Sequence, residues 1–166
     1  AYPPEKTSVK HLITVYPGYV DEKAIQKLKS TNINRIGREI GLGYRARKLP
    51  YWIGKHGQLK HEIDQLFLQH KKKLGFRIDI SNSEKDVFLG DSWYKFLYNC
   101  RAVLGCEGGA SLLDSTGEIR KKVEKYMHDK PNAEFSEVEK ACFPGKDYNI
   151  SLFTISPRHF ECVITK

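Results

Sequence analysis

Basic side chains are concentrated in one stretch of the chain that is suited to bind an anion. Residues 35–60 carry seven of the 28 lysines and arginines against a single acid, Glu39. Arg45, Arg47 and Lys48 follow a glycine-rich, strand-like run, and ligands of open α/β sheets bind beyond the carboxyl ends of the strands. A guanidinium group there can hold a diphosphate through two parallel hydrogen bonds. The alternative is a solvated basic face, because Arg45 and Arg47 alternate as exposed strand residues do.

A second candidate is the glycine-rich run at residues 105–111, which follows a short apolar strand. Glycines such as Gly108 and Gly109 permit close approach of a ligand, and successive backbone N–H groups can form an anion-binding nest. Glu107 could accept hydrogen bonds from a sugar or act as a base. The run matches neither the P-loop nor the dinucleotide fingerprint, so neither ATPase nor dinucleotide binding is indicated. A plain structural turn is the alternative.

The third candidate lies near the end of the chain, where Ser156-Pro157-Arg158-His159-Phe160-Glu161 predicts the start of a helix. Ser156 is the expected N-cap and Pro157 the first helical residue. A helix N-terminus with a serine hydroxyl and an arginine in its first turn attracts phosphate. Glu161 lies one turn further on and could bind a ribose. Alternatively, Glu161 pairs with Arg158 on the helix surface, at a spacing of three residues.

The elements that must position these residues follow from hydrophobic periodicity. Strands are predicted at residues 39–45, 76–80 and 102–104, and an amphipathic helix from Gln58 to Lys73. The order strand, helix, strand favours a βαβ unit and therefore a parallel sheet. Glycines inside the first of these strands predict that another backbone or a ligand comes close there.

Further elements are predicted from capping and turn signals. Asp91 is expected to cap a helix, and Ser115 with Glu118 and Ser136 with Glu139 form two capping boxes, each at the start of a helix. Residues 150–155 are predicted to be extended. Near the N-terminus, the sequence predicts a strand from Leu12 to Tyr16 and a helix from Val20 to Leu28.

Composition limits the class of protein. The chain has 166 residues and a net charge of +8, and its 40% hydrophobic and 29% charged residues are typical of one globular domain. No apolar run is long enough to span a membrane. The four cysteines and six histidines show no metal or redox spacing, so we expect a reduced, cytoplasmic chain without a structural metal.

Five blocks of sequence occur in a distinctive order: GYRARKLPYW at residues 43–52, WYKFL at 93–97, LGCEGGAS at 104–111, ACFPG at 141–145 and ISPRHFE at 155–161. Together they resemble a bacterial glycosyltransferase-like family that is associated with surface polysaccharide biosynthesis. The resemblance extends from about Tyr16 to Lys166.

The resemblance implies a GT-B architecture, in which two Rossmann-like domains face each other and the C-terminal one binds a nucleotide sugar. The expected fold class is α/β, with a Rossmann-like parallel sheet flanked by helices, as an incomplete C-terminal GT-B domain. Residues 1–34 would be a connection from a missing N-terminal domain. Residues 35–166 would be the nucleotide-sugar-binding domain, truncated at its C-terminus.

The resemblance also assigns roles to residues. Arg47 and Lys48 would contact the diphosphate, Ser156 and Arg158 would lie near phosphate, and Glu161 would lie near the ribose. The residue patterns described above complete the predicted substrate site with Arg45, Glu107, Gly108 and Gly109. No catalytic residue is identified.

The implied reaction is transfer of a sugar from a nucleoside-diphosphate sugar to a glycan or lipid-linked acceptor, without a cofactor or metal. The expected partners are these substrates and the missing N-terminal and C-terminal portions of the same protein. A cytoplasmic location at the inner face of the membrane, with peripheral membrane association, is in keeping with this role. Because the acceptor domain is absent, these 166 residues alone are expected to be inactive.

The alternative is a basic module that binds nucleic acid or another polyanion without catalysis. The net charge of +8 and aromatic residues close to lysines favour it. No nucleic-acid motif is present, and the spacing of Trp93, Phe96 and Leu97 indicates a helix core instead. The leading interpretation therefore expects no nucleic acid as a partner.

Overall fold

The computed structural model describes residues 37–165 without a break, and before them residues 8, 10, 11, 13, 15, 16, 18–20, 22, 23, 25 and 26. It divides into two compact units, which are described separately here. The first contains Leu49–Leu59 and Gly108–Thr154, and the second contains residues 37–48, Lys60–Glu107 and residues 155–165. Leu12 and Thr14 of the predicted N-terminal strand, residues 21, 24, 27 and 28 of the predicted helix from Val20 to Leu28, and the expected domain boundary at residue 34 lie outside the described residues.

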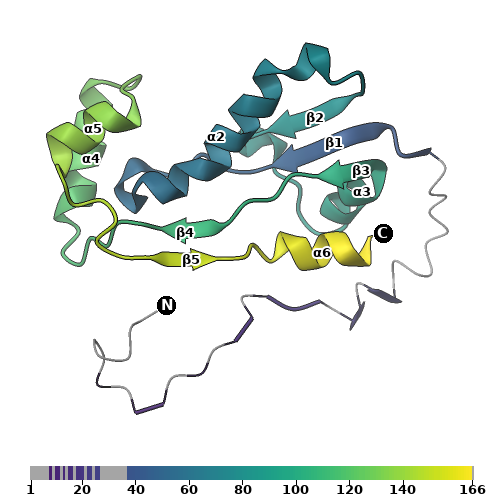
Figure 1. Cartoon of the computed structure of the whole chain (residues 1–166), viewed down its shortest axis with the longest axis horizontal. Coiled ribbons are helices and arrows are strands. Elements are labelled where there is room, and N and C mark those ends of the chain that lie inside the picture. Colours follow the sequence, from purple (N-terminus) through teal and green to yellow (C-terminus); the bar gives the residue numbers. More distant parts are fainter. Residues whose placement is uncertain are drawn as a thin grey trace. The chain divides into compact units, whose positions relative to one another are not determined.

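The second unit is built on a parallel sheet. Among the described residues, β1 (Ile40–Arg45) lies between β2 (Ile78–Ser81) and β3 (Cys100–Val103), as Figure 1 shows. Leu42 is opposite Ile78 on one side and Ala102 on the other. The predicted βαβ unit and parallel sheet are confirmed, and the fold is α/β with a Rossmann-like arrangement of the sheet and its helices.

Helices and short 3-10 turns connect these strands. The predicted helix from Gln58 to Lys73 is α2 (Lys55–Gln69), followed by the 3-10 turn η4 (Lys71–Lys73). After β2 come η5 (Glu84–Asp86) and α3 (Asp91–Asn99), and the described chain closes with α6 (Arg158–Ile164). Among the helices that the structure describes, none combines the length and the apolar character that crossing a membrane requires.

The sheet of the second unit packs on α3. Ile40, Phe96, Leu97 and Cys100 form its buried core. The glycines of β1 make room for this protein's own side chains: a Cβ on Gly41 would clash with Phe76, and one on Gly43 with Cys100 and Phe96. The expectation that a ligand or another backbone comes close to these glycines is therefore wrong.

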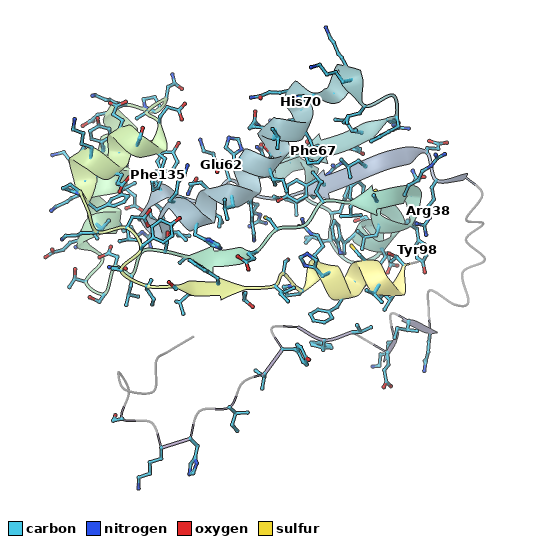
Figure 2. The ribbon with its side chains drawn as sticks, in the orientation of Figure 1. Arg38, Glu62, Phe67, His70, Tyr98 and Phe135 are labelled. Carbon is cyan, nitrogen blue, oxygen red and sulfur yellow. The ribbon has the colours of Figure 1, made fainter. Side chains whose placement is uncertain are left out.

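Arg38 connects the edge strand β3 with the C-terminal end of α6. Its guanidinium donates hydrogen bonds to the carbonyl oxygens of Cys100 at 3.0 Å and Thr165 at 2.8 Å. Figure 2 labels Arg38 just before β1, close to β3 and α6. One of the seven basic residues in the segment 35–60 is thus structural.

The first unit combines a small antiparallel sheet with helices. β4 (Gly108–Ala110) pairs with β5 (Leu152–Thr154), and η3 (Tyr51–Ile53), α4 (Glu118–Asp129) and α5 (Phe135–Cys142) surround a common core. Phe135, labelled in Figure 2, packs edge-on against Tyr51 in that core. Its buried members are Tyr51, Leu112, Ile119, Val123, Ala133, Phe135, Val138, Cys142 and Phe143.

The predicted side-chain caps of four helices are wrong. α3 begins after Gly90, so Asp91 already lies inside the helix, and no side chain caps it. α4 begins after Gly117, and Asp114 rather than Ser115 accepts a hydrogen bond from the backbone, at 2.8 Å from the Arg120 nitrogen. α5 begins after Glu134, so Ser136 already lies inside the helix. At α6 the cap position is Pro157, one residue later than predicted, and no side chain caps it.

Candidate functional site

A cavity of about 310 Å³ in the second unit brings together the first and third candidate segments. Its walls are residues 45–47 at the end of β1, Ser83 and residues 86–88 after β2, Trp93 of α3, and residues around the start of α6. This is the carboxyl edge of the parallel sheet, where ligands of open α/β folds bind. The volume lies at the lower end of the range for small-molecule sites, about 300 to 1,000 Å³.

Arg158 is held in this cavity by two aromatic rings. Its guanidinium carbon lies 5.2 Å from the centre of the Tyr44 ring and 5.2 Å from that of Trp93. Within the described part of the chain, Arg158 has no ion pair with an acid. A guanidinium that is oriented by stacking, with its N–H groups unneutralised, is suited to bind an incoming anion.

Glu161 lies one turn further along α6. Its Oε2 accepts a hydrogen bond from Trp93 Nε1 at 2.8 Å, which fixes the carboxylate at the cavity wall. The alternative interpretation, a surface pairing of Glu161 with Arg158, finds no such ion pair among the described residues. One carboxylate oxygen therefore remains available to accept hydrogen bonds from hydroxyl groups.

Arg45 also lines the cavity, but the protein itself uses most of its donors. Its guanidinium donates to Asp79 Oδ1 at 2.7 Å and to the carbonyl oxygens of Tyr44, Asp79 and Asp86. The same group stacks on Phe88 and Phe96. Four of its five N–H groups are thus directed at internal acceptors, so Arg45 primarily shapes the cavity wall.

The other predicted residues of these two segments differ in position. Arg47 is exposed and lines the cavity, as does the half-buried Ser156, whereas Lys48 is exposed and lies outside it. Asp86 adds a second acid to the lining, and its Oδ2 accepts a hydrogen bond from Ser81 Oγ at 2.6 Å. Arg47 and Arg158 are therefore the two cations in this lining whose guanidinium groups donate to no internal acceptor among the described residues.

The second candidate segment is not brought into the cavity. Glu107 is an exposed residue after β3, and Gly108 and Gly109 belong to β4 of the first unit. The expected loop at residues 105–111 is therefore partly a strand. Gly109 has φ 140°, and a Cβ there would clash with the carbonyl oxygen of Leu152. Close pairing of β4 with β5 thus explains this glycine without a ligand.

Tyr44 supports the site from beneath. It is 1% exposed, and its hydroxyl donates to the carbonyl oxygen of Lys60 at 3.2 Å and lies 3.8 Å from Cys106 Sγ. Burial, together with the neighbouring Cys106 thiol, raises the pKa of Tyr44, and the positive charge of Arg158 partly opposes this. The phenol is therefore neutral at physiological pH, and its ring face is available to the guanidinium.

Sequence reasoning missed Tyr44 and Trp93 as parts of the site. Trp93 was expected to be core packing, and it does pack near Phe96, but it also orients Arg158 and Glu161. Both aromatics stand in the blocks GYRARKLPYW and WYKFL that carry the family resemblance. Their presence beside basic and acidic residues of those blocks was the available signal.

The comparisons with known proteins add no relative. No protein-family model matches the chain, and neither a curated protein nor a solved structure matches it.

Proposed function

We propose that this chain is the nucleotide-sugar-binding part of a GT-B glycosyltransferase, whose complete protein transfers a sugar from a nucleoside diphosphate to a glycan or lipid-linked acceptor. The observation that carries the proposal is the cavity in which Arg47, Ser156, Arg158 and Glu161 meet, although more than 100 residues separate Arg47 from the others. These residues belong to two of the five sequence blocks that resemble the glycosyltransferase-like family.

The lining has the mixture of groups that a nucleoside diphosphate requires. Arg158 and Arg47 provide positive charge for the phosphates. Glu161 provides a carboxylate oxygen for the ribose hydroxyl groups. The apolar side chains of Val87, Phe88 and Trp93 provide surface for a base.

In the proposed reaction, the protein's contribution is electrostatic. Negative charge develops on the diphosphate as the bond to the sugar breaks, and guanidinium groups already oriented toward it stabilise that charge. Tyr44 and Trp93 hold Arg158 in place before the substrate arrives, so its side chain loses little freedom on binding.

Isothermal titration of the chain with UDP, GDP, ADP and their hexose conjugates tests the proposal. We expect one nucleotide class to bind, and Arg158→Ala to weaken that binding by about ten- to a hundredfold, because one or two charge-assisted hydrogen bonds are lost.

Arg120→Ala is the matched control. Arg120 also stacks on an aromatic ring, 5.1 Å above Trp52, but it belongs to α4 in the first unit and does not line the cavity. The Arg120→Ala substitution removes the same charge as Arg158→Ala and should leave the affinity for the nucleotide unchanged. Equal losses in both variants would indicate a general charge effect, and the absence of any nucleotide binding by the wild type would refute the proposal.

A further inference from the structure

His159 lies between Arg158 and Glu161, the two residues of α6 that line the cavity, but the proposed nucleotide site does not use it. We infer that His159 is a hydrogen-bond acceptor for the transferred sugar of the donor. This inference rests on the proposed function and extends it from the nucleotide to the sugar.

The hydrogen bonding of the imidazole ring decides which nitrogen is the acceptor. Nδ1 of His159 lies 2.8 Å from the carbonyl oxygen of Ser156. A carbonyl oxygen can only accept, so Nδ1 carries the proton. In the neutral ring Nε2 then has the lone pair, and it can accept a hydrogen bond from a hydroxyl group.

Gly105 provides the space for this ring. A Cβ at Gly105 would lie 2.5 Å from Nε2 and 3.0 Å from Cε1 of His159. The φ of Gly105 lies outside the left-handed region, so the backbone conformation does not itself require glycine. The glycine is therefore explained by the imidazole that lies over it.

The position along the sheet is that expected for a sugar. Gly105 follows β3, and the preceding Leu104 N–H donates to the carbonyl oxygen of Gly43 at 3.0 Å, so this segment leaves the sheet beside the end of β1. His159 directly follows Arg158, the proposed phosphate ligand. A sugar bonded to the outer phosphate must lie close to that ligand.

The chemistry of the neighbourhood fits hydroxyl groups. His159 is exposed and can be reached from solvent, and the exposed carboxylate of Glu107 is two residues from Gly105. An imidazole nitrogen with a lone pair is suited to accept a hydrogen bond from a hydroxyl group.

The test compares the free nucleotide with its sugar conjugate, using whichever nucleotide the wild-type chain binds among UDP, GDP and ADP, and the conjugates UDP-glucose, UDP-galactose, GDP-mannose and ADP-glucose. His159→Asn can keep the bond to Ser156 but has no acceptor at the position of Nε2. His159→Gln can place an amide oxygen near that position. We expect His159→Asn to weaken binding of the sugar conjugate about five- to tenfold relative to binding of the free nucleotide. His159→Gln should restore much of the lost affinity.

Gly105→Ala gives an independent route to the same result, because its methyl group displaces the ring without changing His159 itself. Far-ultraviolet circular dichroism checks that each variant is folded. If the variants bind the free nucleotide and the conjugate with equally reduced affinity, or if neither affinity changes, His159 does not contact the sugar. The proposed function stands in that case. If the wild type binds no nucleotide, both the proposed function and this inference fail.

Discussion

Two arginines at the same cavity have different tasks because their surroundings differ. Arg45 directs four N–H groups at internal acceptors and stacks on Phe88 and Phe96, so it behaves as part of the wall. Arg158 is stacked on Tyr44 and Trp93 without an acid among its described partners. A sequence shows that both are arginines near glycines or aromatics, but it does not show which donors the fold uses up.

Cys100 is one residue through which stability should depend on alkaline pH, because its linkage starts at a lower pH than that of the buried Tyr44. Burial, with the nearby Asp79 charge, raises the pKa of the Cys100 thiol to about 12 from 9.0, although Arg45 opposes this. The folded state thus favours the neutral thiol. Its contribution to stability is complete below pH 9 and is lost as the pH rises from 9 toward 12, by at most about 1.4 kcal/mol per pH unit.

Urea unfolding of wild type and Cys100→Ala between pH 7 and pH 11 measures this effect. The variant should be less stable at pH 7 because it leaves a cavity, and the difference should shrink above pH 9. Leu97→Ala, in the same core, also leaves a cavity but removes no titrating group. Its stability curve should run parallel to that of the wild type; if the Cys100→Ala curve is parallel as well, the thiol does not govern this pH dependence.

At the scale of elements, α2 begins earlier than its sequence predicts because distant residues cap it. The backbone N–H of Lys55 donates to Asp147 Oδ2 at 3.0 Å, and that of His56 donates to Ser111 Oγ at 3.0 Å. Ser111 Oγ in turn donates to Asp147 Oδ1 at 2.7 Å. These partners lie 55 and 92 residues further along the chain, so no local pattern can indicate them.

Loss of this cap should destabilise the first unit. We expect Asp147→Ala to lower the free energy of unfolding by about 1 to 2 kcal/mol, as for other helix caps, because the Lys55 N–H and the Ser111 hydroxyl lose their acceptor. Thermal or urea unfolding monitored by circular dichroism measures the change. Asp129→Ala, at the end of α4, is a suitable control, and an equal effect there would mean that the cap is not the cause.

The strands of the parallel sheet could be predicted, whereas the antiparallel pair could not. β1 and β2 are rich in apolar residues and are separated by a long amphipathic helix, which is a strong βαβ signal. β4 consists of Gly108, Gly109 and Ala110, which carry no periodicity and little strand preference. Its pairing with Leu152–Thr154 depends on tertiary packing, so the division into two units could not be foreseen.

At the scale of the whole molecule, the charge of +8 is less available to a polyanion than the sequence suggests. Arg38 and Arg45, both in the basic segment 35–60, are used inside the second unit. The net charge still includes them, but their donors are directed at protein acceptors. A cavity-bound diphosphate needs few cations, whereas a polyanion needs a continuous basic surface.

Salt dependence separates these two modes of binding. Between 50 and 200 mM NaCl, nucleotide affinity should fall by less than about tenfold, because few phosphates are contacted. A polyanion that contacts six to ten phosphates should lose about a thousandfold or more over the same range. Titrating the chain with the nucleotide that it binds, and separately with a single-stranded oligonucleotide, at both salt concentrations measures the two changes in affinity. Steep loss for the oligonucleotide, with no nucleotide binding, would support the polyanion alternative.

The central position of β1 has a consequence for synthesis. Its partners in the sheet come later in the chain, with Leu42 opposite Ile78 and Gly43 opposite Val103. During synthesis, β1 is therefore the first of these three strands to leave the ribosome, and it has no partner strand until α2 and β2 have been made. An unpaired apolar strand is a site for aggregation, and glycines lower that tendency. Gly41 and Gly43, which admit Phe76, Cys100 and Phe96 in the folded protein, thus also reduce the risk of mispairing in the nascent chain.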